Sequence, residues 1–186
     1  MGWVFGGRSP ESRSVGIMRR RIPYTSSEVM KMWSKIKPYL LGIALPLAVG
    51  ALAGWLTKDS FAQYMTLRQP PLSPPGWVFP VVWTILYVLM GVGSTRIYLS
   101  SAPERGAALK LYGWQLAVNF VWPLLFFRWQ LRMLALFWLV LLIVLIVRMI
   151  QRFAAIDKTA AYLQVPYLLW SGFALYLNAA VWWLNR

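Results

Sequence analysis

Cysteine and histidine are both missing from this chain of 186 residues. Their absence excludes disulfide bonds, cysteine nucleophiles, histidine proton shuttles and the usual zinc sites, so we expect no metal centre. Acidic residues are scarce as well, since aspartate and glutamate total five. They lie in the N-terminal segment or between apolar runs, at Glu11, Glu28, Asp59, Glu104 and Asp157. A proton- or sodium-coupled pump places acids inside the membrane, so this distribution argues against one.

Charged residues of either sign are few, whereas apolar residues dominate. Charged residues make up 13% of the chain and hydrophobic residues 59%, and the mean hydropathy is +0.55. A soluble domain has about a quarter of its residues charged, so the composition indicates an integral, multi-pass membrane protein in contact with lipid. The net charge of +14 is typical of basic loops that set membrane topology. Because the sequence contains no folded basic domain, we expect no nucleic-acid partner.

Five apolar runs, each near the ~20 residues that a membrane-crossing helix needs, occupy most of the chain. The sequence therefore predicts an all-α integral membrane protein, a bundle of five transmembrane helices. Residues 57–76, between the first two runs, contain two proline pairs and cannot be helical throughout. We expect this segment to form a lid over one end of the bundle. The predicted spans are Pro38–Leu56, Trp77–Leu99, Ala107–Phe127, Met133–Ile150 and Ala160–Leu184.

The segment before the first span is polar, basic and rich in serine, glycine and arginine. We expect residues 1–34 to form a disordered basic tail and residues 35–186 to form the transmembrane domain. A transit peptide or a later start, at Met18, Met30 or Met32, is the alternative for this segment. The lysine and arginine distribution predicts a cytoplasmic N-terminus with the long loop outside. A bacterial cell membrane fits best, with an outer membrane or a mitochondrial outer membrane as alternatives.

Twelve tryptophans are present, and several lie too deep in a span for the aromatic belt at the membrane interface. Helical spacing places them on shared faces with tyrosines and amides. Two explanations fit these faces. The first is helix packing, with amides bonded across helices. The second is a cavity for a large, flat, apolar ligand that stacks on aromatic rings. The faces are Trp83, Tyr87 and Met90 in the second span, Gln115, Asn119, Trp122 and Phe126 in the third, and Tyr167, Trp170, Ala174 and Asn178 in the fifth.

Two further spans have distinct patterns. The fourth is almost uniform in leucine, isoleucine and valine, which is typical of a helix that faces lipid. In the first, Gly50 and Gly54 form a G-x-x-x-G pair of the kind that allows close helix contact or dimerisation. A homodimer is therefore one partner that the sequence allows.

The same regions resemble a known family. The stretch Pro70-Pro71-Leu72-Ser73-Pro74-Pro75-Gly76-Trp77-Val78-Phe79, with Trp83-Thr84-Ile85-Leu86-Tyr87, is similar to the signature of the TspO/MBR family of translocator proteins, tryptophan-rich sensory proteins and peripheral-type benzodiazepine receptors. The similarity continues through Trp114-Gln115-Leu116, Asn119, Trp122-Pro123 and Val165-Pro166-Tyr167-Leu168-Leu169-Trp170, and covers roughly residues 38–186. It implies a five-helix bundle that binds porphyrins such as protoporphyrin IX and haem, as a sensor, carrier or scavenger.

The resemblance also assigns residues. Pocket positions of the family match Tyr64, Tyr87, Asn119 and Trp122, and the two tryptophans tied to light-dependent porphyrin breakdown match Trp83 and Trp170. The chain departs from the family at Gln63 and Gln69, where a tryptophan and a lysine are usual. With the helical faces included, the predicted ligand-binding residues are Tyr64, Trp83, Tyr87, Asn119, Trp122, Tyr167, Trp170 and Ala174.

Three functions stay open at this point: a porphyrin-binding sensor, carrier or scavenger; a light- and oxygen-dependent porphyrin-degrading activity, with Trp83 and Trp170 catalytic; or a structural membrane protein with a vestigial pocket. No cofactor is required, and porphyrin or haem enters as a ligand. Haem iron usually takes histidine, cysteine, methionine or tyrosine, of which only the last two occur here. We therefore expect aromatic stacking to hold the macrocycle, with Lys58 or Arg68 near its propionates.

Overall fold

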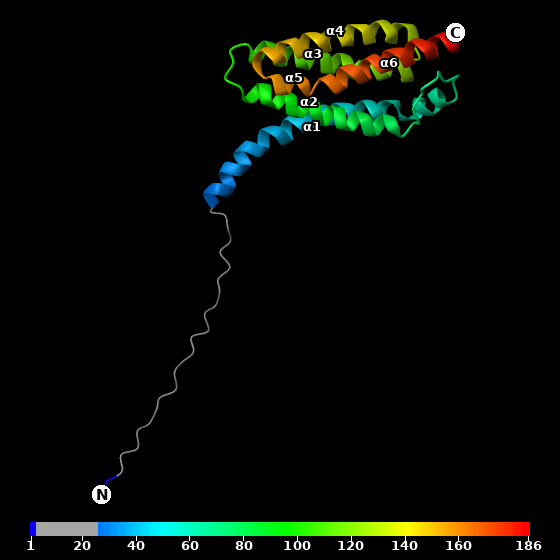
Figure 1. Ribbon diagram of the computed structural model, residues 1–186. Helices are drawn as coiled ribbons and strands as arrows, with labels where there is room; N and C mark the ends of the chain where they lie inside the picture. The colour runs from blue at the N-terminus through cyan, green and yellow to red at the C-terminus, as the bar shows by residue number, and fades with distance from the viewer. Residues whose placement is uncertain (3–25) are drawn as a thin grey trace.

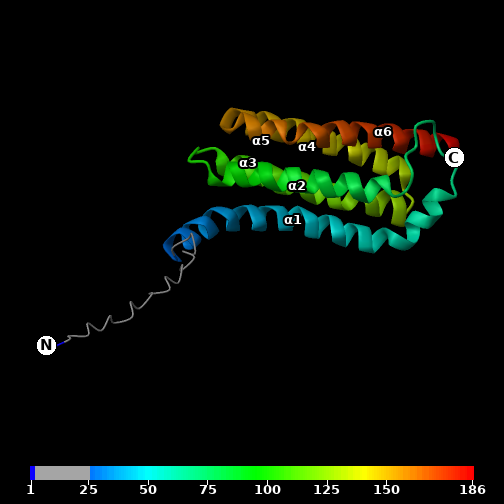
Figure 2. The same ribbon diagram turned by 60° about the horizontal axis from the view of Figure 1, so that its bottom comes forward.

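The computed structural model describes residues 1–2 and 26–186, and this part of the chain is helical without a strand (Figure 1). A π-helical turn, η1 (Leu124–Arg128), extends the third helix, and the short α5 (Lys158–Tyr162) precedes the last one. The long helices lie side by side in a bundle, and the start of α1 projects beyond it (Figures 1 and 2). Five helices have 19 residues or more: α1 (Ser26–Met65), α2 (Val78–Leu99), α3 (Arg105–Pro123), α4 (Arg132–Ile156) and α6 (Val165–Leu184).

Three helices in the described part of the chain are long and apolar enough to cross a membrane. They are Ser27–Met65, Val78–Leu99 and Arg132–Ile156. The predicted all-α class is confirmed for the described residues. The count of five spans stays a prediction, because α3 and α6 do not reach the same apolar content.

Helix α1 extends beyond the predicted span Pro38–Leu56 at both ends. It begins at Ser26, so residues 26–34, which the sequence assigned to a disordered tail, are helical; the predicted tail residues 3–25 lie outside the described part. It ends at Met65, which shortens the connection to residues 66–77. Hydropathy marks where a helix contacts lipid, whereas the helix itself continues into polar sequence at both ends and includes Pro38 and Pro46.

The predicted span Ala160–Leu184 is divided into α5 and α6. Asp157 caps α5, since its Oδ1 accepts the Ala160 N–H at 3.0 Å. Pro166 lies in the first turn of α6, where its missing N–H costs no helical bond. Asp157 also pairs with Arg96 of α2, with 2.7 Å between Oδ2 and Nη2. The turn between α4 and α5 is therefore fastened to the end of α2.

Helix α4 packs against both α3 and α6. Its prediction as a lipid-facing helix therefore holds for one face only: the other face is buried, and its residues recur every three or four positions as a helical stripe requires. These buried residues are Ala135, Leu139, Leu142, Ile146, Met149 and Phe153.

Close packing of α1 on α2 depends on Gly91. A Cβ atom at this position would lie 2.5 Å from the Cα of Ile43 and 2.7 Å from the carbonyl oxygen of Gly42. Thr95, one turn further along α2, donates its hydroxyl to the Gly91 carbonyl at 2.7 Å. Only glycine lets the two backbones approach this closely.

Candidate ligand cavity

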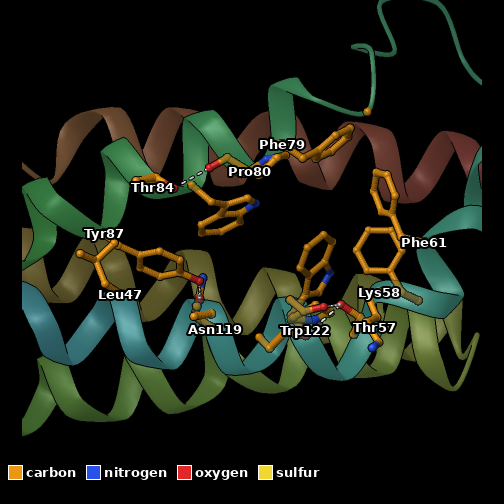
Figure 3. A pocket seen from close by; sticks show the side chains of 18 residues that line it. Leu47, Thr57, Lys58, Phe61, Phe79, Pro80, Thr84, Tyr87, Asn119 and Trp122 are labelled. Atoms are coloured by element: carbon orange, nitrogen blue, oxygen red, sulfur yellow. Dashed lines mark hydrogen bonds between the residues drawn. The ribbon is translucent and has the colours of Figure 1, made fainter.

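A cavity of about 640 Å³ lies between α1, α2 and the end of α3 (Figure 3). Its volume falls within the ~300–1,000 Å³ that small-molecule sites usually have. The lining is mainly apolar, and rings come from all three walls. The aromatic lining residues are Phe61 of α1, Phe79, Trp83 and Tyr87 of α2, Trp122 of α3 and Phe127 of η1.

Small residues of α1 make room for this cavity. Gly50, Ala51, Ala53 and Gly54 all line it. A Cβ atom on Gly50 would overlap the ring of Tyr87, whereas a Cβ atom on Gly54 would meet nothing within 4 Å. The G-x-x-x-G pair therefore seats an aromatic ring and leaves open space beside it. The sequence did not predict that α1 forms a wall of the cavity, although its run of small residues was a signal for close approach at this point.

The inner wall is a chain of buried hydrogen bonds between helices. Tyr87 donates its hydroxyl to Oδ1 of Asn119 at 3.0 Å, a bond drawn in Figure 3. Asn119 donates Nδ2 to the hydroxyl of Tyr167 at 3.0 Å, and Tyr167 donates to Oε1 of Gln115 at 2.9 Å. Each of these side chains is at most 7% exposed. Bonding across helices satisfies polar groups that hydrocarbon could not, and the hydroxyls of Tyr87 and Tyr167 both have partners.

The wall formed by the end of α3 and by η1 begins at a proline, Pro123. Pro123 has no N–H, and the backbone after it widens into η1, where the Trp129 N–H reaches the Leu124 carbonyl oxygen at 2.9 Å. Such π-helical turns are often found at functional sites. Trp122 stacks on Phe126 with 5.5 Å between ring centroids, and its Nε1 donates to Oδ1 of Asn178 at 3.3 Å. The indole is thus fixed in position beside the cavity.

The cavity opens along the seam between α1 and α2. Lining residues on both sides of this seam are exposed: Ala51, Gly54 and Lys58 on α1, and Pro80 and Thr84 on α2. Both helices that border this mouth are long and apolar enough to cross a membrane.

Charge around the cavity is limited to one side chain. Lys58 is the single ionised residue among those that line it, and it lies at the end where Phe61 and Phe79 also lie (Figure 3). The Thr57 hydroxyl already has a hydrogen-bond partner, since it donates to the Ala53 carbonyl at 2.9 Å. Within the described residues, no three histidine, cysteine, aspartate or glutamate side chains come together as metal ligands. The cavity therefore offers rings, one cation and few free polar groups.

Four of the eight predicted ligand-binding residues line the cavity: Trp83, Tyr87, Asn119 and Trp122. Trp83 also stacks on Tyr87, with 5.4 Å between centroids. The other four do not line it. The structure differs here from the prediction that the fifth span supplies a wall, because α1 packs along α2 and takes that place.

The residues outside the lining belong to the core cluster or pack against it. Tyr64 is 5% exposed and packs edge-to-face on Phe126 and Phe127. Trp170 contacts Phe79 from the far side, with 6.1 Å between centroids. Tyr167 and Ala174 are buried on the inner face of α6. Tyr64, Trp170 and Tyr167 therefore contact rings that line the cavity, Tyr167 through Trp83 with 6.2 Å between centroids.

The proline-rich connection, residues 66–77, is fastened to α6. Asn185 accepts the Arg68 N–H at 3.0 Å and donates to the Arg68 carbonyl at 3.1 Å, and Tyr176 donates to the Pro71 carbonyl at 2.8 Å. Only Gly76 of this segment lines the cavity. Arg68 does not line it, so of the two predicted cations Lys58 alone does. The two departures from the family have hydrogen-bond partners: Gln63 accepts a bond from the distant Gln130, and Gln69 bonds locally to Tyr64 and Ser73.

Fold and site together describe an integral membrane protein, a helical bundle with an aromatic cavity. The profile of the TspO/MBR family matches residues 42–184. The chain is 38% identical over 157 residues to a "Tryptophan-rich protein TspO" of Chlorobaculum tepidum, an alignment that covers 83% of this chain and 99% of that one. It is 33% identical over 153 residues to a "Tryptophan-rich sensory protein" of Cereibacter sphaeroides (82% and 92% covered) and 35% identical over 146 residues to a "Translocator protein" of Bos taurus (76% and 86%). The chain belongs to the TspO/MBR family.

Proposed function

We propose that this protein binds a porphyrin, or a similarly large, flat and apolar molecule, in the cavity between α1, α2 and α3, as a sensor, carrier or scavenger. The observation that carries this proposal is the lining, in which six aromatic side chains surround about 640 Å³. A conjugated macrocycle stacks favourably on such rings. Lys58, at the edge, supports the same ligand class, because a propionate carboxylate pairs with an ammonium group.

Aromatic rings, not a metal bond, hold the ligand in this proposal. Tyr87 is the one lining residue of a type that ligates haem iron, and its hydroxyl is already bonded to Asn119. Iron-free protoporphyrin IX and haem should therefore bind purified protein with comparable affinity in the dark. Much tighter haem binding that is lost in Tyr87→Phe would contradict this view. Absence of saturable binding of either compound would leave a structural role for the protein.

The mouth between α1 and α2 supports entry of the ligand from the lipid. Gly54→Leu should narrow this mouth and weaken porphyrin binding by about tenfold or more, because a side chain there projects into open space that the ligand needs. Gly113→Leu is the matched control, since Gly113 also has nothing within 4 Å and does not line the cavity. Equal affinities of the two variants in a fluorescence-quenching titration would contradict the proposed site.

The membrane topology is part of the proposal: five spans, a cytoplasmic N-terminus and, as the best fit, a bacterial cell membrane. With 19 and 20 residues, α3 and α6 are long enough to cross a bilayer at 1.5 Å per residue. Their mean hydropathy is lowered by amides and tyrosines on their buried faces, such as Gln115, Asn119 and Asn178. Those groups bond to other helices, so they do not expose polar atoms to lipid.

Light- and oxygen-dependent breakdown of the porphyrin is the second candidate function. The position of Trp83 in the cavity wall, stacked on Tyr87, favours it, whereas Trp170 lies behind Phe79. Trp83→Phe should then stop the light-dependent loss of porphyrin absorbance while dark binding persists, and Trp170→Phe should have a smaller effect. Unchanged bleaching in both variants would rule out a role for these tryptophans.

A further inference from the structure

A second hollow lies away from the aromatic cavity, between the start of α4 and the end of α6. It is an open groove of about 590 Å³, and none of its lining side chains is acidic. Two arginines line it from opposite helices, Arg132 on α4 and Arg186 after α6. The C-terminus lies at this end of the bundle (Figure 1). The remaining lining residues are Gln130, Leu131, Met133, Leu134, Phe137, Trp182 and Asn185.

The cationic end of the groove has free capacity for an anion. Arg186 stacks on the ring of Trp183, with 3.3 Å from Cζ to the centroid, which holds the guanidinium in place without neutralising it. Arg132 makes one weak side-chain contact, from Nη2 to Oε1 of Gln130 at 3.4 Å. The ion pair of Arg96 with Asp157 lies in another part of the bundle. Guanidinium groups match the geometry of a phosphate better than any other side chain.

The backbone at this point adds to the same preference. Helix α4 has 25 residues and no side-chain cap, so N–H groups of its first turn lack partners within the helix. Met133 and Leu134 belong to this turn and line the groove. The N-terminus of a long helix attracts negative charge, so it reinforces the two arginines.

The other end of the groove is apolar and continues along the outside of α4. Leu134, Phe137, Leu141 and Val144 follow one another at helical spacing and are 44–61% exposed. This row leads from the cations toward the middle of α4, which is apolar enough to cross a membrane. A ligand that fits both ends carries an anionic group joined to a long hydrocarbon chain.

We propose that this groove is a binding site for one anionic phospholipid, with its phosphate between Arg132 and Arg186 and an acyl chain along Leu134 and Phe137. Trp182, in the groove wall, belongs to a residue type that favours the depth of lipid headgroups. A free phosphate ion would use the cations but not the apolar row. The site is separate from the porphyrin cavity and does not depend on the function proposed for that cavity.

The experiment counts lipids on the full chain, purified in detergent, by native mass spectrometry with phosphatidylglycerol and phosphatidylcholine. We expect one phosphatidylglycerol to bind more tightly than phosphatidylcholine, and Arg132→Gln with Arg186→Gln to weaken it by about tenfold or more. The matched control is Arg148→Gln with Arg152→Gln, which removes the same charge from exposed positions at the other end of α4 and should keep the bound lipid.

The proposal is overturned by equal binding of the two lipids, by unchanged phosphatidylglycerol binding in the Arg132/Arg186 variant, or by an equal loss in the Arg148/Arg152 control. Excess inorganic phosphate should compete poorly; if it displaces the lipid, the apolar row contributes nothing and the lipid assignment fails. Arg132→Lys with Arg186→Lys, which keeps the charge, should retain part of the affinity and so separates a lost phosphate contact from misfolding.

Discussion

At the scale of single residues, Asn119 connects the cavity lining to the hydrogen bonds between helices. It lines the cavity, accepts a bond from Tyr87 and donates one to Tyr167. Its side chain is 2% exposed, so these bonds are buried. The sequence predicted a ligand-binding role for this amide and also suggested an amide bonded across helices; the structure places it in the cavity lining and bonds it to tyrosines of α2 and α6.

Asn119→Leu should lower the free energy of unfolding by about 1–3 kcal/mol, because it leaves the Tyr87 hydroxyl without its acceptor in a buried place. Thermal unfolding in detergent measures this change. Gln151→Leu is the control, since Gln151 is an exposed amide on α4, and it should be neutral. Similar unfolding temperatures for wild type and Asn119→Leu would show that the hydrogen-bond chain does not stabilise the bundle.

At the scale of helices and turns, two contacts fix how the elements meet. The α1–α2 crossing depends on backbone approach at Gly91, and the α4–α5 turn depends on Asp157. Neither contact follows from hydropathy, which places the spans but says nothing about which helices touch.

Gly91→Ala should destabilise the protein by about 1–3 kcal/mol, because the new methyl group overlaps the α1 backbone, which cannot move aside as a side chain can. Gly113→Ala, at an exposed glycine of α3 with open space around it, should be neutral or stabilising by up to about 1 kcal/mol. Chemical denaturation of the two variants side by side measures both effects. A destabilised Gly113→Ala and an unaffected Gly91→Ala would contradict the packing described.

The pH dependence of the α4–α5 turn follows from Asp157. Burial opposes the charged form, but the Ala160 N–H and the Arg96 guanidinium outweigh it and hold the pKa of Asp157 below its ordinary 3.8. A carboxyl group with a lowered pKa in the folded state stabilises the protein above its unfolded pKa. This contribution is lost as the pH falls through the folded pKa.

The stability difference between wild type and Asp157→Asn should therefore be constant above about pH 5 and shrink below about pH 4. Asparagine keeps the helix cap, so the variant isolates the charge. Unfolding temperatures measured across this range test it. A difference that grows as the pH falls would mean that the carboxylate is not stabilised in the fold.

At the scale of the whole molecule, the absence of cysteine makes topology measurable, because any introduced cysteine is unique in the chain. Thr66→Cys, at the start of the proline-rich connection, and Ser101→Cys, between α2 and α3, place exposed thiols at the two ends of α2. With a cytoplasmic N-terminus and a spanning α1, an impermeant maleimide should label Thr66→Cys in intact cells, and Ser101→Cys only after lysis. The reverse pattern would invert the predicted orientation.

The sequence by itself determined the helical class, the membrane setting, the family and the residue types of the site. Composition and periodicity are local properties, and they report the environment of each segment and the face on which its rings lie. The sequence placed Trp83, Tyr87, Asn119 and Trp122 on inward faces, and the cavity has all four in its lining.

Only the tertiary structure decided which helices enclose the cavity. Helix α1 takes the place expected for α6 because glycine at positions 50 and 91 lets it approach α2, and the hydrogen bonds of Tyr167 and Asn178 hold α6 behind the inner wall. These contacts join residues far apart in the chain, so no local pattern encodes them. For the same reason, the sequence does not reveal the groove between Arg132 and Arg186, which forms because the fold brings the start of α4 beside the end of α6.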